Sequence, residues 1–452
     1  MIVCKFGGTS VGDAEAIART ASIIGARRER KPVVVVSALA GATNALLAIA
    51  EQSARGQLIG ALAAIESLRE RHLEQSQLLL AADQAVADDI CAELSAMFDE
   101  LAMLADALNT LGDLTPRSLD AIASLGEQMS SVLIVAAFKL RGLPAVHVDA
   151  RHVVITDDAF TRAEPQPDAI AEATQRLVVP ILRDGHIPVM GGYIGSAKSN
   201  TLGRGGSDYS ASLVGAALQA DAIEIWTDVD GMLTADPRVV QGSQLIERIA
   251  FDEASELASF GAKVLHPNTI APAVTKGIPV WILNSRRPEG TGTLITFDAP
   301  RRPVTAIAGK SGVSLVKVRS ARMLLTEGFM RRLFGVFERH KTSVDVVATS
   351  EVSVSVTIDD PSRLDALMVD LREHGDVTVE RNRGIVSVVG TGLADGGKAM
   401  ACALTAIGDI QVHMLSLSAS GINLTVVVDG EQVIPAMQRL HAAFFGDSAT
   451  CI

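Results

Sequence analysis

The segment Ile2-Val3-Cys4-Lys5-Phe6-Gly7-Gly8-Thr9-Ser10 joins an apolar run to a glycine-rich turn. The apolar run predicts a strand of a parallel sheet buried on both faces. A helix is expected to begin near Asp13, so the glycines lie where a strand ends and a helix starts. Free backbone N–H groups and the helix dipole favour phosphate at such a place, and glycine lets the backbone approach phosphate oxygens closely. Read alone, the turn also fits a tight connection with an incidental lysine.

Two later turns repeat this arrangement. Ser37–Asn44 follows an apolar run and places small hydroxyls and a glycine at a strand end, where ligands of open α/β sheets bind. Thr201–Asp208 precedes a helix. It contains Arg204, whose planar guanidinium suits a substrate carboxylate, and Asp208, whose charge can orient a lysine or magnesium. Three such turns in one sheet favour a ligand site over three unrelated connections.

Short β-rich runs alternate with helical patterns as far as about residue 300, which is typical of a parallel sheet covered by helices. Between residues 45 and 140 the pattern is almost wholly helical and predicts a helical insertion beside the sheet. The expected fold class is therefore α/β. The strand candidates are Ile2–Phe6, Val33–Ser37, Ala145–Val148, Ile187–Met190, Ile223–Thr227 and Val280–Leu283.

Beyond a predicted linker at Asn284–Pro303, the sequence repeats with an offset of about seventy residues, the range of duplicated small domains. Each copy has the order strand, helix, strand, strand, helix. The first copy ends in a further strand at Asp376–Arg381, whereas the second has none after its last helix. Since a sheet that lacks its last strand leaves an unpaired edge, Val304–Ala308 is expected to fill that place.

Composition argues against several classes of function. A net charge of −12 over 452 residues, with no cluster of Lys and Arg, disfavours nucleic acid as a partner. Cys4, Cys91, Cys402 and Cys451 share no metal-ligand or redox spacing, which favours a reducing compartment. Lys5 interrupts the first apolar stretch, so no signal-peptide core is expected, nor a later apolar run of membrane-spanning length. The expectation is a cytoplasmic protein of two or three domains, without membrane contact.

Some motif-like segments are rejected as sites. Gly309-Lys310-Ser311 imitates the end of a P-loop, but Val304 stands where the first glycine is needed. Gly390–Gly396 imitates a dinucleotide-binding turn, yet its third glycine is one position late and too little chain follows. His266 has no ligand-spaced partner, so a packing or capping role is favoured over metal binding.

Taken in order, the segments named at the end of this paragraph resemble the aspartate kinase family of the amino-acid kinase superfamily, and the resemblance covers nearly the whole chain. The duplicated tail resembles the paired ACT domains of its monofunctional, lysine-sensitive type. The resemblance implies an amino-acid kinase fold, a mainly parallel sheet between helices, in residues 1–295, then two α+β ferredoxin-like ACT domains in 312–382 and 383–452, the second completed by strand 304–309. The blocks are Lys5–Ser10, Ser37–Asn44, Ser124–Glu127, Leu202–Asp208, Trp226–Val229, Asp236–Arg238, Gly261–Pro267, Ser343–Asp345 and Thr349–Glu351.

The resemblance implies transfer of the γ-phosphoryl group of ATP, with Mg²⁺, to the side-chain carboxylate of L-aspartate, giving 4-phospho-L-aspartate for the lysine, threonine and methionine pathways. An aspartate carboxylate has a pKa of about 4 and is already ionised at neutral pH, so the reaction needs no general base. Positioning and charge neutralisation remain. The implied roles are phosphoryl stabilisation by Lys5, charge organisation by Asp208, binding of the α-carboxylate by Arg204 and of the ammonium by Glu127, with Ser37 and Thr43 completing the pocket.

The resemblance further implies a nucleotide site and an effector site. Lysine is the first expected effector and threonine the second, although a pair of ACT domains that only joins subunits of a homo-oligomer is also possible. No residue is assigned as a metal ligand. The nucleotide would contact Lys5, Gly7, Gly8, Thr9, Ser10, Ser207, Thr227, Asp228, Leu233, Arg238, Lys263 and Val264, and the effector Met323, Thr326, Phe329, Ser343, Val344 and Asp345.

The sequence departs from the family pattern at two places. Leu233 stands where a tyrosine is common, and the loop Gly195–Thr201 is shortened, with Asn200 where a threonine is usual. Altered nucleotide affinity is the expected result.

Two other functions remain open from the sequence. One is another carboxylate or phosphate kinase of the superfamily, such as a glutamate or acetylglutamate kinase, against which Glu127, Arg204 and the doubled tail argue. The other is a non-catalytic amino-acid sensor, against which the intact Lys5 and Asp208 argue.

Overall fold

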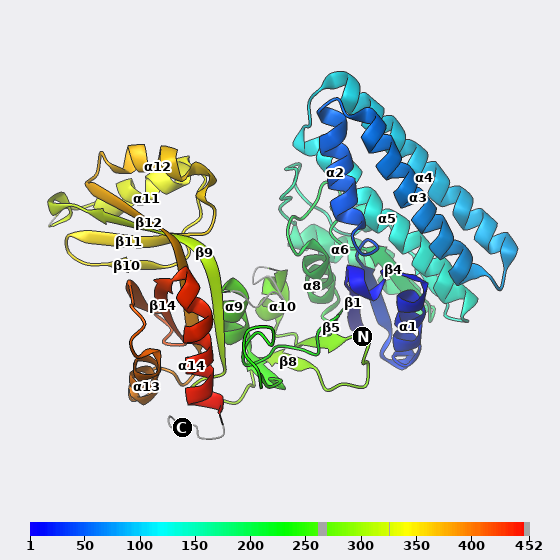
Figure 1. Cartoon of the computed structure of the whole chain (residues 1–452). Helices are drawn as coiled ribbons and strands as arrows, with labels where there is room; N and C mark the ends of the chain where they lie inside the picture. The colour runs from blue at the N-terminus through cyan, green and yellow to red at the C-terminus, as the bar shows by residue number, and fades with distance from the viewer. Residues whose placement is uncertain (261–268, 325, 447–452) are drawn as a thin grey trace. The chain divides into compact units, whose positions relative to one another are not determined.

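The computed structural model describes residues 1–260, 269–324 and 326–446 (Figure 1). The chain forms two compact units. The first comprises Met1–Met232 and Val264–Phe297, and the second comprises Leu233–Lys263 and Asp298–Ile452. The segment after Met232, which the sequence assigned to the catalytic domain, therefore packs with the second unit.

Seven strands of the first unit lie in one sheet in the order β3-β4-β2-β1-β5-β7-β8. Neighbours from β3 to β7 are parallel, whereas β8 is antiparallel to β7. The α/β fold class and all six strand candidates are confirmed. The strands are β1 (Ile2–Phe6), β2 (Pro32–Val36), β3 (Ala145–His147), β4 (Ile187–Gly191), β5 (Ala222–Thr227), β7 (Val280–Asn284) and β8 (Thr293–Thr296).

The prediction of a plain linker at Asn284–Pro303 is wrong, because β8 lies inside it. Its register pairs Ile295 with Val280 and Thr293 with Ile282. The run Thr-Leu-Ile-Thr after Gly292 is short and does not alternate between polar and apolar residues, so the sequence carries little signal for this edge strand.

Alternation along β1 sends its side chains to two different helical layers. Cys4 and Phe6 pack into a core shared with α1 (Ala14–Gly25) and α5 (Pro116–Leu140). Val3 faces the opposite layer, where it approaches Gly215 of α8 (Gly206–Leu218). Lys5 shares the side of Val3, since alternate residues of a strand share a face. The lysine is thereby directed toward α8.

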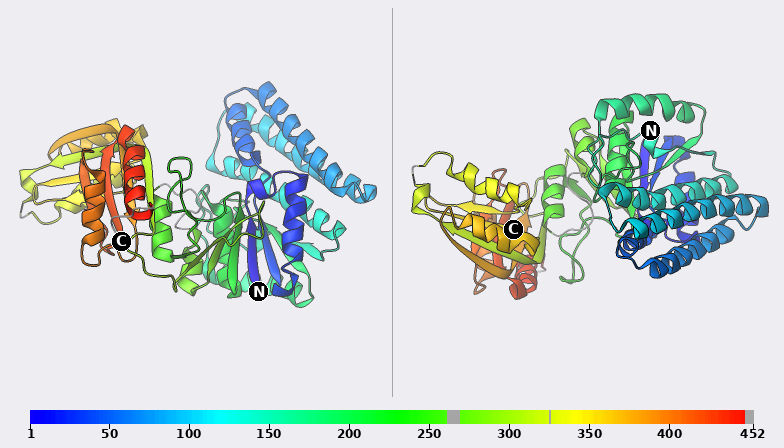
Figure 2. Two further views of the ribbon diagram at one scale, coloured as in Figure 1. Left: turned by 60° about the horizontal axis from the view of Figure 1, so that its bottom comes forward. Right: turned by 90° about the horizontal axis from the view of Figure 1, so that it is seen from above.

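The expected helical insertion consists of four helices with their own core (Figures 1 and 2). Leu46, Ile65, Phe98 and Leu125 are buried in this core, one from each helix. The last helix also continues along the sheet through Leu133–Phe138. The insertion is formed by α2 (Ala42–Ala54), α3 (Leu58–Leu80), α4 (Gln84–Leu111) and α5, and the remaining helices of this unit are α6 (Pro167–Leu177), α7 (Val179–Arg183) and α10 (Ala271–Lys276).

Helix α5 is long and apolar enough to cross a membrane, contrary to the expectation that no apolar run would reach that length. Its 18-residue window has a mean hydropathy of 1.5, and 89% of that window is buried inside the protein. Its N-cap, Thr115, accepts a hydrogen bond from the Ser118 amide, and Pro116 begins the first turn. Burial on this scale fits the central core helix of a globular unit.

The second unit contains a six-stranded sheet in the order β10-β11-β9-β12-β14-β13. Its two long central strands each serve both copies of the repeat. Lys310–Ala306 pairs with Ile385–Val389, in the place that the second copy lacked, and Leu315–Arg319 pairs with Glu380–Asp376 in the first copy. The strands are β9 (Ala306–Arg319), β10 (Val347–Thr349), β11 (Ser353–Ile358), β12 (Asp376–Val389), β13 (Met414–Leu417) and β14 (Asn423–Asp429), with β6 (Arg248–Ala250) and helices α9 (Phe251–Ser259), α11 (Phe329–Arg339), α12 (Leu364–Leu371), α13 (Lys398–Ile407) and α14 (Val433–Phe445).

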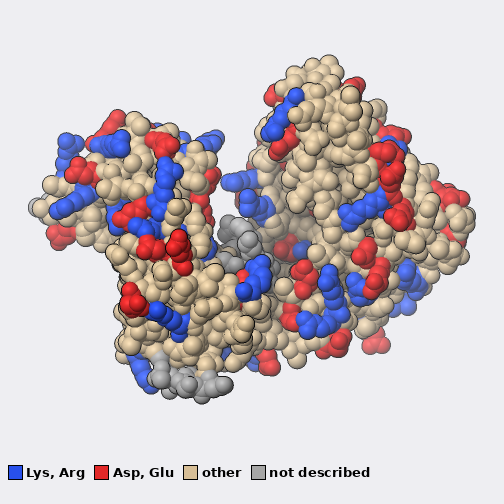
Figure 3. All heavy atoms as spheres, viewed as in Figure 1, with Lys and Arg blue, Asp and Glu red and all other residues tan. Residues whose placement is uncertain are grey.

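Neither sign of charge dominates the visible surface. On the face shown in Figure 3, acidic and basic side chains are interspersed on each unit. A strong positive field of the kind that attracts nucleic-acid phosphates is not formed by the described residues on this face.

Candidate active site

The structure joins two of the turns singled out in the sequence through an ion pair. Lys5 Nζ, at the end of β1, lies 2.6 Å from Asp208 Oδ1, in the first turn of α8. The two side chains are only 11% and 12% exposed. A lysine and an aspartate about two hundred residues apart in sequence thus form one buried charged group beside a helix N-terminus, where an anion is stabilised.

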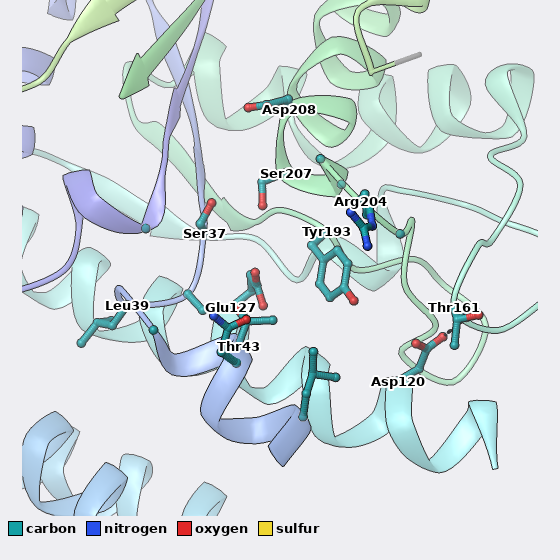
Figure 4. A pocket seen from close by; sticks show the side chains of 18 of the residues that line it. Ser37, Leu39, Thr43, Asp120, Glu127, Thr161, Tyr193, Arg204, Ser207 and Asp208 are labelled. Carbon is teal, nitrogen blue, oxygen red and sulfur yellow. Dashed lines mark hydrogen bonds between the residues drawn. The ribbon is translucent and has the colours of Figure 1, made fainter. Parts of the chain in front are cut away.

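A cavity of about 750 Å³ opens beside this ion pair (Figure 4). It lies at the edge of the sheet where β1 and β2 end, as expected for a ligand site of a parallel sheet. Eight of the predicted site residues line it: Lys5, Gly8, Ser37, Thr43, Glu127, Arg204, Ser207 and Asp208.

Glu127 projects into this cavity from α5, and its side chain is nearly inaccessible, since the residue is 3% exposed. Burial raises the pKa of its carboxyl to about 8, although a backbone hydrogen bond from Ala38 and the charge of Lys5 oppose the shift. Its Oε2 atom has no hydrogen-bond partner among the described residues. A buried acid with an unpartnered oxygen is suited to a cationic ligand group.

Arg204 supplies an exposed positive charge on the same cavity. It lies between Gly203 (φ +78°) and Gly205 (φ +69°), whose left-handed backbone shapes the turn before α8. Its guanidinium makes no ion pair with any residue that the structure describes. Figure 4 shows Arg204 and Glu127 around the same hollow, so the cavity offers a cation and an acid to one small ligand.

The glycine-rich turn is held by its backbone and by Ser10. The Gly7 amide donates to the Trp226 carbonyl at 3.0 Å. Ser10 is buried, and its hydroxyl donates to the Ser285 hydroxyl at 2.8 Å, with the Trp226 carbonyl at 3.2 Å. Thr9 is exposed. Among the described residues of the turn Gly7–Ser10, only Gly8 lines the cavity. Ser10 holds the turn from inside, and its expected contact with nucleotide remains a prediction.

The other expected nucleotide residues that the structure describes belong to both units. Thr227 ends β5 and Asp228 follows it, and the Thr227 hydroxyl donates to Asp228 Oδ1 at 3.3 Å. Leu233 and Arg238 belong to the second unit, where Arg238 forms a surface ion pair with Asp236 at 2.6 Å. Lys263, Val264 and His266 lie outside the described residues.

Several cavity residues were not predicted from the sequence, among them Tyr193 and Asp120. Tyr193 follows the strand end of β4 in a left-handed conformation (φ +68°), and burial raises the pKa of its phenol. Asp120 lies two turns before Glu127 on α5 and is 1% exposed. It accepts hydrogen bonds from the Thr161 amide at 2.6 Å and the Thr201 hydroxyl at 2.7 Å. The signal available was the pair Gly191-Gly192 after a predicted strand, a fourth turn of the same kind.

The shortened loop is tightly bound to its surroundings. Asn200 is buried, and its amide nitrogen donates to the carbonyls of Asp157 and Ala159 at 2.8 and 2.9 Å. The Thr156 hydroxyl donates to its oxygen at 3.0 Å. Asn200 therefore stabilises the loop itself, and the expected change in nucleotide affinity remains a prediction.

Known proteins resemble this chain over nearly its whole length. Residues 1–284 match the model of the amino acid kinase family, and residues 386–444 match that of an ACT domain. The chain is 37% identical to lysine-sensitive aspartokinase 3 of Escherichia coli (strain K12), over 98% of this chain and 99% of the relative. It is 35% identical to the chloroplastic aspartokinase 3 of Arabidopsis thaliana, over 99% of this chain and 82% of that protein.

The chain belongs to the aspartokinase family.

Solved structures of this family agree over the whole chain. The E. coli aspartokinase III complex with aspartate and ADP, the R-state, matches with a TM-score of 0.86 and 36% identity, covering 98% of this chain and 100% of that chain. The complex of the same E. coli enzyme with lysine and aspartate, the T-state, matches with a TM-score of 0.80 and 35% identity, covering 98% and 99%. The amino-acid kinase fold followed by ACT domains is thus confirmed.

In this aspartokinase, the expected effector residues lie in the first copy of the repeat. Phe329, at the start of α11, is buried in an apolar cluster against which Met323 and Val344 pack. Asp345 forms an ion pair with Lys310 of β9 at 3.1 Å, and Lys310 also pairs with Asp359 at 2.6 Å. Thr326 and Ser343 are exposed. Lys310, which the sequence offered only in a rejected P-loop, is the contact that sequence reasoning missed.

Proposed function

We propose that this protein is an aspartate kinase that transfers the γ-phosphoryl group of ATP to the side-chain carboxylate of L-aspartate. One observation carries the proposal. A single cavity combines the buried Lys5–Asp208 ion pair with Glu127 and the unpaired Arg204. In a chain of the aspartokinase family, these groups match a dicarboxylic amino acid and a phosphate donor.

The residues divide the work by charge. Glu127, with its free oxygen, binds the ammonium of aspartate, and Arg204 binds the α-carboxylate with a planar pair of donors. Ser37 and Thr43 line the space beside them. The side-chain carboxylate is then directed toward Lys5, whose ammonium neutralises charge on the phosphoryl group as the acceptor oxygen approaches it. The attacking carboxylate is already ionised, so no proton must be removed.

Mg²⁺ is expected to accompany ATP. Asp208 is the cavity carboxylate closest to the proposed phosphoryl position, since it already pairs with Lys5, and it would face the metal directly or through water. The metal would supply further neutralisation of phosphate charge. In the protein itself, Lys5 supplies positive charge at the phosphate end of the cavity, and Asp208 holds the Lys5 ammonium in place.

The proposal is tested by coupled ADP release with purified protein. ADP release is compared with aspartate, glutamate or N-acetylglutamate as acceptor, and the acyl phosphate is trapped with hydroxylamine. We expect turnover with aspartate, and loss of about a hundredfold or more in kcat for Lys5→Ala, because an electrostatic contact to the transition state is removed. Lys276→Ala, an exposed lysine at the end of α10, is the control and should retain wild-type kcat.

The rival functions predict different results. A better rate with glutamate or N-acetylglutamate would identify another carboxylate kinase. Absence of ADP release with every acceptor would favour a non-catalytic amino-acid sensor. Equal turnover by Lys5→Ala and wild-type protein would overturn the mechanism while leaving the substrate assignment intact.

Feedback control by lysine is the regulatory part of the proposal, with threonine as the second candidate. It is supported by the lysine-sensitive E. coli relative and by the acidic group at Asp345 in the first repeat. We further propose a cytoplasmic homo-oligomer joined through the ACT repeats. Gel filtration with light scattering, with and without added lysine, tests the assembly.

A further inference from the structure

One arginine of the helical insertion joins two ligand-binding turns of the same unit. Arg71, on α3, donates from Nη1 to the Ala40 carbonyl at 2.7 Å and from Nη2 to the Gly12 carbonyl at 3.0 Å. Ala40 belongs to the turn after β2, and Gly12 to the turn after β1. A single guanidinium therefore bridges the substrate-side turn and the phosphate-side turn.

A second side chain on the same face of α3 supports this bridge. Gln75, one helical turn after Arg71, accepts a hydrogen bond from the Ala14 amide at 2.7 Å. Ala14 is the first residue of α1, so its N–H has no partner within the helix. The adjacent cap residue Asp13 accepts from the Ala16 amide at 2.8 Å. The start of α1 is thus fixed from both the turn itself and the insertion.

The two bridged turns also touch each other at the cavity. A Cβ atom added at Gly8 would lie 3.1 Å from the Ala38 carbonyl oxygen, and one at Gly12 would lie 3.0 Å from the Ala40 Cβ. Gly8, Ala38 and Ala40 line the cavity, whereas Arg71 is not among its lining residues. A shift of either turn would therefore change the shape of the cavity. Arg71 opposes such a shift from outside the cavity, through its hydrogen bonds to both turns.

The insertion is itself anchored firmly enough to act as a support. The neighbouring His72 is buried, and its ring packs edge-on against Phe98 of α4 with ring centres 5.3 Å apart. Its Nδ1 lies 2.7 Å from the Leu68 carbonyl. Arg71 thus extends from a helix whose adjacent residue is locked in the core of the insertion.

We propose that Arg71, supported by Gln75, is a positioning residue that sets the distance between the phosphate-binding turn and the aspartate-binding turn. The insertion then serves catalysis as well as stability. The inference deepens the proposed kinase function and rests on it for its kinetic consequences. Its structural basis, the two carbonyl contacts, is independent of the substrate.

The chemistry of arginine explains the choice of residue. Its planar guanidinium presents several donors in fixed directions, so it can hold two carbonyl oxygens from different segments at once. Lysine retains the charge but is a compact point donor on a flexible stem. Arg71→Lys should therefore keep the fold and lose part of the positioning, and Arg71→Met should lose it entirely.

The test compares Arg71→Met, Arg71→Lys and Gln75→Leu with a matched control. Arg69→Met removes an arginine from the same helix whose partners, Asp99 and Glu66, lie within the insertion. We expect Arg71→Met to lower kcat/KM for aspartate by about 10- to 100-fold, as for a small misplacement of reacting groups, with kcat lowered as well as KM raised. Arg71→Lys and Gln75→Leu should be intermediate, and Arg69→Met should match wild type. Methylguanidinium should partly restore kcat to Arg71→Ala and not to Lys5→Ala.

A second measurement does not depend on turnover. Amide hydrogen exchange in residues 7–14 and 37–44 should accelerate in Arg71→Met and stay unchanged in Arg69→Met, since the bridge restrains these turns. If wild-type protein shows no aspartate-dependent ADP release, the proposed function fails and this exchange result alone decides the inference. The inference would be overturned if Arg71→Met showed the same kinetics and the same hydrogen exchange as the control Arg69→Met. If Arg71→Met cannot be obtained folded, wild-type kinetics and exchange in Arg71→Lys and Gln75→Leu would overturn it equally.

Discussion

Glu127 is a carboxylic acid at rest and is needed as a carboxylate when substrate arrives. Burial raises its pKa to about 8, so at pH 7 the free site is mostly protonated. Binding an ammonium requires the ionised form, so aspartate must bind with release of a proton. We expect the KM for aspartate to fall as pH rises from 6 toward about 8 and to level off above it. Calorimetric titrations in buffers of different ionisation enthalpy would measure the proton release.

Glu127→Gln supplies the control for this prediction. It should weaken aspartate binding at every pH and abolish both the pH dependence and the proton release. Because the folded-state pKa lies above the unfolded one, the carboxyl destabilises the fold as pH rises from about 4.5 to about 8. The variant should therefore raise Tm at pH 8.5 and change it little at pH 4. A KM for the wild type that does not change between pH 6 and 8 would contradict the assignment.

A cavity residue could be predicted from the sequence where its residue type and its place beside a strand or helix indicate its role. Lys5 lies near the end of a strand, Arg204 just before a helix and Asp208 in the first turn of that helix, and their charges suggest phosphate or carboxylate binding. Tyr193 is part of the cavity because its backbone takes a left-handed conformation, and Asp120 because three loop donors surround it. Both causes arise from tertiary structure, and the sequence signal nearby was the pair Gly191-Gly192 just ahead of Tyr193.

At the scale of elements, the cavity depends on how closely α8 approaches β4. A Cβ added at Gly192, just after β4, would lie 2.8 Å from the Ser207 Cα. Since a backbone atom cannot turn away, Gly192→Ala should displace the start of α8 and with it Asp208. We expect a loss of about tenfold or more in kcat/KM and a destabilisation of about 1–3 kcal/mol. Steady-state kinetics and thermal denaturation measure the two effects.

Gly215→Ala is the matched control for this helix. Its added Cβ would lie 2.7 Å from Ile223 Cδ1, the far end of a flexible side chain. Gly215 also lies about two helical turns along α8 from Asp208. It should cost similar or smaller stability and leave kcat/KM near the wild-type value. Equal kinetic losses in the two variants would mean that general destabilisation, and not displacement of the helix start, lowers activity.

Strands with a clear pattern of apolar residues could be predicted from the sequence. The length of strands that depend on pairing with a neighbouring strand could not. The parallel strands could be predicted from their apolar runs, because both faces of each strand are buried. The sequence predicted separate strands on either side of Ser311 and of Asn382, whereas the structure has the continuous strands β9 and β12. Gly312 (φ +86°) and Asn382 (φ +56°) lie at the register shifts between these strands. They look like chain breaks in the sequence and act as bulges inside a paired ladder.

At the scale of the whole molecule, an effector bound in the second unit must change turnover in the first. Such coupling requires an effector with different affinity for two states of the protein. The family's solved R-state and T-state structures match this chain with TM-scores of 0.86 and 0.80. The sequence indicated the repeat and its function by resemblance, but the charge arrangement at the expected effector site emerges only when β9 is placed beside Asp345.

That arrangement makes lysine sensitivity testable through one carboxylate. Asp345 and Asp359 share the single ammonium of Lys310, so a negative charge remains for a basic effector. The pKa of Asp345 is raised to about 6. Burial is the main cause and Asp359 adds to it, while the charge of Lys310 opposes the shift. Asp345→Asn should increase the lysine concentration for half-inhibition by about 10- to 100-fold, the worth of a charge-assisted hydrogen bond, while uninhibited kcat stays unchanged.

The same carboxylate gives the inhibition a pH dependence of known sign. Asp345 loses its charge as pH falls through about 6, so wild-type inhibition by lysine, measured as the ratio of inhibited to uninhibited ADP release, should be weaker at pH 5.5 than at pH 7.5. In Asp345→Asn the ratio should be the same at both pH values. Asp365→Asn, whose side chain is 91% exposed and pairs with Arg381, should behave as wild type. Wild-type inhibition in Asp345→Asn would instead place the effector away from Lys310 and favour an ACT pair that joins subunits without binding lysine here.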